Sequence, residues 1–349
     1  MTNQTNENPI PIDLDALQSW MDKIGLESGP LINVNLLAGG TQNILLRFDR
    51  GGKEFVLRRP PLHLRKNSND TMMREARVLE ALTATNVPHP KFIASCDDTD
   101  VLGAYFYLMA PVDGFNPANG LPQLHASDPA IRNRMGYSYI EGMAALGAID
   151  YKMVGLEGFG KPEGFLKRQS SRWMQQLESY ASFDHWTGFK ELPNVDKIVS
   201  WLDDNLPEES VPGILHGDCH LANTMFSHDS AELAAFVDWE LATIGDPLID
   251  LGWVMATWAD EHTAVVGDIK PWEGFPKLDE LISYYDECSP RNLDAVNWYG
   301  VLACFKLGSI LEGTHARASA GKAPKETGDS LHMMTISLFD RAHRLIAKN

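Results

Sequence analysis

The chain has 349 residues, of which 44% are hydrophobic and 22% charged, a balance typical of globular proteins. Its formal net charge of -17 argues against non-specific nucleic-acid binding, which needs a basic surface, and no apolar run reaches the ~20 residues of a membrane span. The polar N-terminus lacks the apolar segment of a signal peptide, and the four scattered cysteines form no CxxC pair. We therefore expect a cytoplasmic protein without a nucleic-acid or membrane partner.

The first third of the chain predicts a small α+β domain. Residues 1–10 are polar and are expected to be disordered, and Asp13 can cap an amphipathic helix that follows it. Five apolar segments then predict β-strands, and Gly51-Gly52 is a hairpin signal between the second and the third. The strands are expected at residues 34–37, 43–48, 54–58, 92–95 and 105–109, with one helix inserted among them at 71–83.

Beyond Pro111 the apolar residues recur at helical spacing. Helices are expected at residues 131–149, 162–180, 195–205, 247–258, 278–288, 295–317 and 328–347. A proline and a glycine interrupt the pattern near 110–114, so we place a domain boundary there. The predicted fold class is α+β, with a small lobe over residues 11–110 and a larger, mostly helical lobe over 111–349.

The segment from Ile214 to Glu240 carries the chemistry. It contains His-Gly-Asp218, then Asn223 five residues later, then an apolar run that ends in Asp238-Trp-Glu240. Phosphoryl transfer of the kinase type needs one carboxylate to accept the hydroxyl proton, and an amide oxygen with a second carboxylate to hold Mg²⁺. Asp218, Asn223 and Asp238 offer these groups in that order. One such aspartate alone would be an ordinary turn residue, but three donors in register favour a catalytic site.

This segment resembles the aminoglycoside phosphotransferase (APH)-like family, whose members are built like protein kinases. Residues 165–173 and 240–251 are similar to the branch whose kinase-like domains are fused to some acyl-CoA dehydrogenases. The resemblance runs from about Leu36 to about Gly321. It implies a bilobal protein-kinase-like fold, with nucleotide binding in a five-stranded antiparallel small lobe and with the catalytic loop, the metal site and the acceptor in the helical lobe.

The resemblance also implies two residues that shape the catalytic loop. His216 would anchor the loop by hydrogen bonds and would not itself be a catalyst. Asp250 would accept hydrogen bonds from backbone amides of the loop. Asp246, just before Pro247, is typical of a helix N-cap and is interpreted as structural.

By the same resemblance, the phosphates are contacted from the small lobe. Arg58 stands where kinases carry a lysine, Glu75 would pair with it, and Arg59 is the alternative if the assignment is wrong by one residue. A glycine loop between two strands could bring backbone N–H groups to anionic oxygens, although a plain turn is the simpler interpretation. Its candidate residues are Gly39, Gly40, Thr41 and Asn43.

The connector between the lobes would offer its backbone to the adenine edge. Ala110 and Val112 lie in this connector. Val56, Met109 and Phe226 would sandwich the ring, although plain core positions are equally compatible with these side-chain types.

The acceptor side is less defined. Arg168 and Arg172 lie four apart on a predicted helix and share a face, so they could bind a carboxylate or the phosphates of coenzyme A, or could pair with neighbouring acids. Lys306 and Arg317 leave the same alternatives open. Glu240 could assist the metal or acceptor, or could cap the following segment.

Together these patterns predict Mg²⁺- and ATP-dependent transfer of a γ-phosphoryl group to a hydroxyl of a small molecule, with a metabolite favoured. The alternatives are an aminoglycoside antibiotic kinase, a hydroxyacyl-CoA kinase and a non-catalytic nucleotide-binding module (a pseudokinase). The acceptor, the choice between ATP and GTP, and the oligomeric state, for which a homodimer is one option, stay open.

Overall fold

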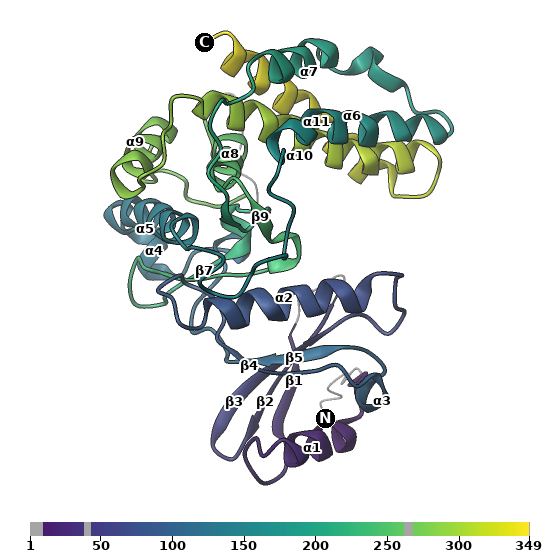
Figure 1. The fold of residues 1–349 in the computed structure, drawn as a ribbon, viewed down its shortest axis with the longest axis vertical. Helices are drawn as coiled ribbons and strands as arrows, with labels where there is room; N and C mark the ends of the chain where they lie inside the picture. The colour runs from purple at the N-terminus through teal and green to yellow at the C-terminus, as the bar shows by residue number, and fades with distance from the viewer. Residues whose placement is uncertain (1–9, 38–42, 262–267, 349) are drawn as a thin grey trace, which may run out of the picture. The chain divides into compact units, whose positions relative to one another are not determined.

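The structure, a computed structural model, describes residues 10–37, 43–261 and 268–348 (Figure 1). The chain divides into two compact units. Unit 1 comprises residues 1–85 and 89–112, and unit 2 comprises residues 86–88 and 113–349.

Unit 1 is built on one five-stranded antiparallel sheet with the strand order β1-β2-β3-β5-β4. The strands are β1 (Ile32–Leu36), β2 (Ile44–Arg50), β3 (Lys53–Arg59), β4 (Phe92–Cys96) and β5 (Phe106–Met109). Each strand falls where the alternation of the sequence predicted it. Strand β3 is buried on both faces over its last five residues. It is therefore the strand best placed to hold a polar side chain at a fixed position.

Two helices cover the sheet of unit 1. Helix α1 (Leu14–Lys23), capped by Asp13, packs Leu17, Trp20 and Met21 into the core that β2, β3 and β5 also build. Helix α2 (Ser68–Leu82) packs against β4 and β5. Helix α3 (Thr99–Leu102) was not predicted, because four residues are too few to show a helical period.

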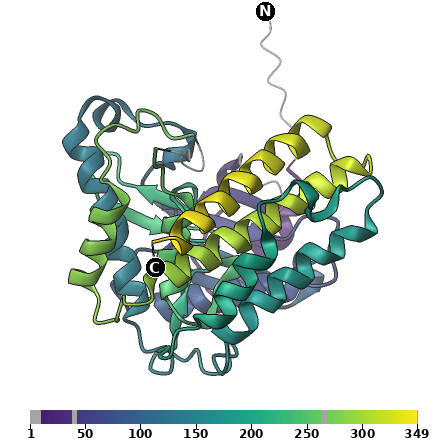
Figure 2. The ribbon, with the colours of Figure 1, turned by 90° about the horizontal axis from the view of Figure 1, so that it is seen from above.

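Unit 2 is mainly helical. Its α-helices are α4 (Gln123–Ser127), α5 (Pro129–Gly147), α6 (Gln169–Glu178), α7 (Val195–Asp204), α8 (Leu248–Thr257), α9 (Leu278–Cys288), α10 (Val296–Ser319) and α11 (Lys325–Ile346). Figure 2 shows α10 and α11, the longest pair, running side by side. Among the described residues, no helix combines the length and the apolar character needed to cross a membrane.

Two small antiparallel ribbons in unit 2 frame the segment from 213 to 245. Strand β6 (Gly213–Leu215) pairs with β9 (Thr243–Gly245), and β7 (Thr224–Phe226) pairs with β8 (Leu233–Phe236). Helix α8 follows β9, and all ten of its residues are buried. The ribbons and this buried helix give the loops between them rigid ends.

Candidate active site

The loop that carries Asp218 leaves β6 through a residue that must be glycine. Gly217 has φ +85°, and a Cβ atom there would lie 2.4 Å from the backbone oxygen of Leu241. L-residues with a side chain disfavour this left-handed region, and the contact leaves no room for one. The His-Gly-Asp sequence is therefore required by the backbone geometry of the turn.

Asp250, in the first turn of α8, holds the start of this loop. Its Oδ2 accepts a hydrogen bond from the N–H of His216 at 2.7 Å, and its Oδ1 accepts one from the N–H of Gly217 at 2.9 Å. Burial raises the pKa of Asp250 to about 6, even though these two N–H groups and Lys306 favour its ionised form. The carboxylate thus spans both amides, as the sequence predicted for this position.

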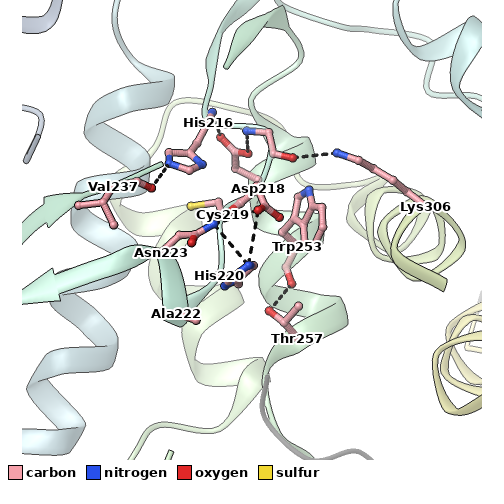
Figure 3. A network of polar contacts seen from close by, with 12 residues as sticks. His216, Asp218, Cys219, His220, Ala222, Asn223, Val237, Trp253, Thr257 and Lys306 are labelled. Atoms are coloured by element: carbon pink, nitrogen blue, oxygen red, sulfur yellow. Dashed lines mark hydrogen bonds and ion pairs between the residues drawn. The ribbon is translucent and has the colours of Figure 1, made fainter. Parts of the chain in front are cut away.

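The His216 side chain connects the same loop to Val237, the residue that follows β8. Its Nε2 lies 3.0 Å from the carbonyl oxygen of Val237, as drawn in Figure 3. Burial lowers the pKa of His216 to about 4, against the charges of Asp218 and Asp238. The imidazole is therefore neutral at pH 7 and donates its Nε2 hydrogen to Val237.

The β7–β8 ribbon brings Asn223 to Asp238. Thr224 is opposite Phe236, and the N–H of Val237 donates to the carbonyl of Asn223 at 2.9 Å. Asn223 therefore faces the residue that precedes Asp238. Asp238 itself has φ 66° and ψ 63°, in the left-handed region that few residues other than glycine, asparagine and aspartate adopt.

Asn223 also contacts Asp218 directly. Its side-chain NH₂ donates to Asp218 Oδ2 at 2.9 Å and to the Asp218 carbonyl at 3.0 Å (Figure 3). This use of the nitrogen leaves the side-chain oxygen of Asn223 as the group for a cation. The structure thus joins the Asn223 and Asp218 side chains directly, and the pairing of Val237 with Asn223 brings the backbone of Asp238 close to Asn223.

Asp218 is ionised in this setting. Burial disfavours its charge, but the interaction with His220 and the ammonium of Lys306 outweigh that cost, so its pKa lies below the usual value. The side chain keeps 27% of its surface exposed, so a ligand can reach it. His220 Nε2 lies 3.6 Å from Asp218 Oδ2, which makes it a direct neighbour of the carboxylate.

Lys306, on α10, is one of the residues whose role the sequence left open, and it lies beside the loop that carries Asp218. Its Nζ donates to the carbonyl of Gly217 at 2.8 Å and lies 4.8 Å from the ring centre of Trp253 and 5.6 Å from that of Trp173 (Figure 3). Burial lowers its pKa to about 8, against the opposing pull of Asp218 and Asp250. Helices α6, α8 and α10 meet at Lys306. The helical spacing within α10 does not predict which other helices lie beside this residue.

The single helix expected to carry Arg168 and Arg172 is divided in the structure. Arg168 ends a 3₁₀ turn (Leu166–Arg168) that runs directly into α6, the helix that carries Arg172. Its guanidinium donates to the backbone carbonyls of Glu163 and Lys161. The sequence predicted one continuous helix because a 3₁₀ turn and an α-helix differ little in spacing over three residues. Arg172 remains exposed, with its guanidinium 5.1 Å from the Trp173 ring centre.

The positions of Arg317 and Glu240 neither support nor exclude contact with an acceptor. Arg317 is exposed and donates to Thr314 on its own helix. Glu240 lies in a 3₁₀ turn (Trp239–Leu241) and is partly exposed.

In unit 1, Arg58 rather than Arg59 pairs with Glu75. Arg58 Nε donates to Glu75 Oε2 at 2.9 Å, and both side chains are buried. Consecutive residues of a strand point to opposite faces, so Arg59 points away from the face on which Arg58 meets Glu75. The one-residue ambiguity of the sequence is thereby removed for this ion pair.

One backbone group of the connector already has a hydrogen-bond partner within unit 1. The N–H of Ala110 already donates to the carbonyl of Lys91 at 2.9 Å, so it is not available to a ligand. Val56 and Met109 are cross-strand partners on β3 and β5, and Val112 is the last residue of unit 1.

Phe226 is a correction to the expected sandwich. Its ring packs against Phe115 with centroids 6.4 Å apart, and it has no exposed surface. Met225, the preceding residue of β7, is partly exposed. Strand alternation sends Phe226 inward, which an apolar pair in a sequence does not reveal. Among the residues of the glycine loop, Asn43 precedes β2, whereas Gly39, Gly40 and Thr41 lie outside the described residues.

Residues 33–273 of the chain match the phosphotransferase enzyme family, APH. This match covers more than half of the chain. The chain belongs to the APH phosphotransferase family. Its bilobal kinase-like α+β fold was thus correctly predicted, and small-molecule kinase is the activity class that the family supports.

This APH-family chain is also similar to individual proteins. It is 30% identical over 325 residues to acyl-CoA dehydrogenase family member 11 of Gallus gallus, covering 90% of this chain and 40% of that protein. A crystal structure from Ralstonia eutropha JMP134, provisionally described as an aminoglycoside phosphotransferase, matches with a TM-score of 0.78 and 27% identity over 95% of this chain and 99% of that one. A ternary complex of the aminoglycoside phosphotransferase APH(4)-Ia with ADP and hygromycin B has a TM-score of 0.52 and 14% identity, covering 91% of this chain and 98% of that one.

Proposed function

We propose that the chain is a Mg²⁺- and ATP-dependent kinase that transfers the γ-phosphoryl group to a hydroxyl of a small metabolite. The observation that carries this proposal is the set formed by Asp218, Asn223 and Asp238. Two of them are hydrogen-bonded to each other, and the third directly follows Val237, whose N–H donates to the carbonyl of Asn223. Carboxylate and amide oxygens at one ribbon end are the donor set of phosphoryl-transfer enzymes.

Asp218 would position the attacking hydroxyl. Its lowered pKa makes it an ionised acceptor at neutral pH, suited to hold a hydroxyl proton from the start of the reaction. A strong base is not needed, since the transition state of phosphoryl transfer is loose and the hydroxyl loses its proton late. The hydrogen bond from Asn223 and the anchored Gly217 turn would fix the direction of the carboxylate.

Asn223 and Asp238 would hold Mg²⁺. The residues fit this role because Mg²⁺ prefers oxygen ligands, the Asn223 nitrogen is already used by Asp218, and the Asp238 side chain is partly exposed. The bound cation would neutralise charge on the nucleotide phosphates. The left-handed backbone of Asp238 would direct its carboxylate.

Unit 1 would bind the nucleotide. Arg58, held by buried Glu75, offers a fixed cation for phosphate oxygens, and Asn43 with the glycine loop could add polar groups. Val56 and Met109 would contact the adenine ring, with the carbonyl of Ala110 and the backbone of Val112 as edge partners. Solved members of the fold bind adenine nucleotides, as the ADP and AMP-PNP complexes of APH(4)-Ia show for that protein.

The charges near Asp218 favour an acceptor that carries an anionic group. Lys306 lies beside the catalytic loop, and Arg172 approaches closely enough to lower its pKa further by repulsion. A polycationic aminoglycoside would meet two cations there, whereas a carboxylate or phosphate would be attracted. The similarity to an acyl-CoA dehydrogenase family member makes a hydroxyacyl thioester one acceptor to test.

The deciding experiment is a search for a phosphorylated product. Purified protein is incubated with Mg²⁺ and ATP or GTP, and in turn with hydroxyacyl thioesters, hydroxy acids, ethanolamine and aminoglycosides, and products are identified by mass spectrometry. Asp218→Asn should lower kcat by about 10²- to 10⁴-fold while nucleotide affinity changes little. Asp229→Asn, a change at an exposed loop carboxylate nearby in the sequence, is the matched control.

Each rival function has its own outcome in this screen. Phosphorylated aminoglycoside as the best product would replace the metabolite kinase with an antibiotic kinase. Nucleotide binding without product from any acceptor, and without nucleotide hydrolysis, would support the non-catalytic module. Full turnover by Asp218→Asn would overturn the role of that carboxylate.

A further inference from the structure

A second cluster of polar side chains lies in unit 2, on α10 and α11. Glu312, His315 and His332 each offer one ligand atom, and these three atoms lie within 4.8 Å of one another. Glu312 has no exposed surface and His332 is 7% exposed. None of the three takes part in the proposed phosphoryl transfer.

The sequence positions two of these ligands on one helix. Glu312 and His315 form a Glu-x-x-His pair, and residues three apart lie on the same face of an α-helix. Helix α11 supplies His332 from the opposite side. The two helices approach closely next to His315, since a Cβ atom added at Gly328 would lie 2.3 Å from the Cβ of Ala318. The backbone is thus arranged to bring the three side chains together.

The hydrogen bonds around the cluster resemble those that orient metal ligands. His332 Nδ1 lies 2.8 Å from Glu312 Oε2, and its other nitrogen lies 3.4 Å from Glu191 Oε2. The indole N–H of Trp186 donates to the second oxygen of Glu312 at 2.7 Å. A carboxylate behind a ligating histidine and a donor behind a ligating carboxylate are the usual outer contacts of a metal site.

The two imidazoles need a shared partner. Their rings are stacked with centroids 4.2 Å apart and planes 22° apart, a contact that two imidazolium cations would resist. The Nδ1 atom of His315 is buried without a hydrogen-bond partner, and Asp329 Oδ1 is 4.0 Å away from it. A divalent cation would bind neutral imidazoles, satisfy a buried nitrogen and balance the buried charge of Glu312.

We propose that Glu312, His315 and His332 form a site for a borderline transition-metal cation, with Zn²⁺ as the first candidate. Two nitrogens and one carboxylate oxygen suit Zn²⁺ and its neighbours in the first row, whereas Mg²⁺ prefers oxygen alone. Water or the side chain of Asp329 could complete four-coordination. The bound cation would fasten α10, the helix that carries Lys306, to α11.

The test uses the untagged full-length chain, stripped of metal with a chelator. Zn²⁺ is titrated against a chromogenic chelator, and Co²⁺ is added separately, because its visible absorption reports the ligand geometry. We expect one bound equivalent per chain and a four-coordinate Co²⁺ spectrum. His315→Ala and His332→Ala should each weaken Zn²⁺ binding at least about tenfold, and Trp186→Phe should weaken it less.

The matched control is His63→Ala, which removes an exposed histidine of unit 1 and should leave the affinity unchanged. If the alanine variants do not fold, the near-isosteric Glu312→Gln decides, since it removes the ligand charge but keeps the size of the side chain. A wild-type chain that binds no Zn²⁺ more tightly than Glu312→Gln would overturn the site. A six-coordinate Co²⁺ spectrum that the ligand variants leave unchanged would do the same.

Discussion

At the scale of single residues, Asp238 would contribute in two ways. Its carboxylate would bind the cation, and its short polar side chain tolerates the left-handed backbone at this position. Its left-handed conformation costs most residues ~1–2 kcal/mol, and aspartate and asparagine tolerate it best. Asp238→Ala would lose both the metal ligand and this tolerance, whereas Asp238→Asn would lose only the charge. We expect Mg²⁺-dependent nucleotide affinity to fall in the order wild type, Asn, Ala, with Ala at least about tenfold weaker.

Calorimetric titration of nucleotide with and without Mg²⁺ measures this order. The affinity without Mg²⁺ should be similar in all three proteins, because the change acts through the cation. Equal Mg²⁺-dependent affinities for wild type and Asp238→Ala would remove Asp238 from the metal site.

Lys306 predicts a pH dependence for an anionic acceptor. Because its pKa lies at about 8, the ammonium loses its proton above that pH, and the KM for the acceptor should rise there. A charge-assisted hydrogen bond contributes about 1.5–3 kcal/mol, so Lys306→Met should raise this KM at least about tenfold at pH 7 and flatten its pH profile. Lys306→Arg, which keeps the charge through the whole range, should preserve low KM above pH 8.

The titration of Lys306 would not itself unfold the protein in this pH range. The folded-state pKa of Lys306 is below its ordinary value of 10.5, so between pH 8 and that value the unfolded chain binds more protons than the folded one. The contribution of this group to stability therefore increases as pH rises through the window. A melting temperature followed over the same pH range separates the two effects.

At the scale of elements, two aspartates at the start of α8 have different tasks: Asp250 lies in its first turn, and Asp246 lies just before it. Asp250 accepts two loop N–H groups, whereas Asp246 accepts the N–H of Leu248 at 3.0 Å and the hydroxyl of Tyr299 at 2.8 Å. In Asp250→Asn one amide would face the side-chain NH₂, so we expect a loss of about 1–3 kcal/mol together with a lower kcat.

Asp246→Asn is the comparison for that change. It should lower stability by weakening the hydrogen bonds from Leu248 and Tyr299, while kcat at a temperature well below melting stays near that of wild type. Denaturant unfolding and turnover of both variants give the comparison. If Asp250→Asn retains full kcat, the shape of the loop does not depend on this carboxylate.

The elements also show how far the sequence could predict the fold. Helix α9 was predicted with the bounds it has, and the five strands of unit 1 fell within a few residues, because amphipathic periods report one buried face. Strands β6 and β9 were not predicted. Each has three residues, and each is stabilised by a partner some thirty residues away, which no local pattern records.

The candidate site divides in the same way. The spacing of Asp218, Asn223 and Asp238 was readable, since a loop and a strand fix them locally. The position of Lys306 between Trp173 and Trp253, the inward turn of Phe226 and the 3₁₀ turn at Arg168 depend on packing between distant segments. Their chemistry was visible in the sequence, but their neighbours were not.

At the scale of the whole molecule, the net charge of -17 acts against the local cations beside Asp218. An anionic acceptor must approach a negative chain before it meets Lys306 and Arg172. Long-range repulsion is screened at 0.15 M ionic strength, where the Debye length is about 8 Å, whereas partly buried contacts are screened much less. Added salt should therefore assist the approach of an anion more than it weakens the final contacts.

With nucleotide saturating, kcat/KM for an anionic acceptor should rise by up to about tenfold as ionic strength increases from about 0.01 M to 0.15 M. A cationic aminoglycoside should show the opposite slope, because salt would remove its long-range attraction, and a neutral alcohol should show almost none. Steady-state rates with one acceptor of each charge measure the three slopes on the same protein. A falling slope for the anion would mean that the local cations dominate its approach. The anion would then still differ from the neutral alcohol. The expectation that long-range repulsion by the net charge limits the approach of the anion would, however, be wrong.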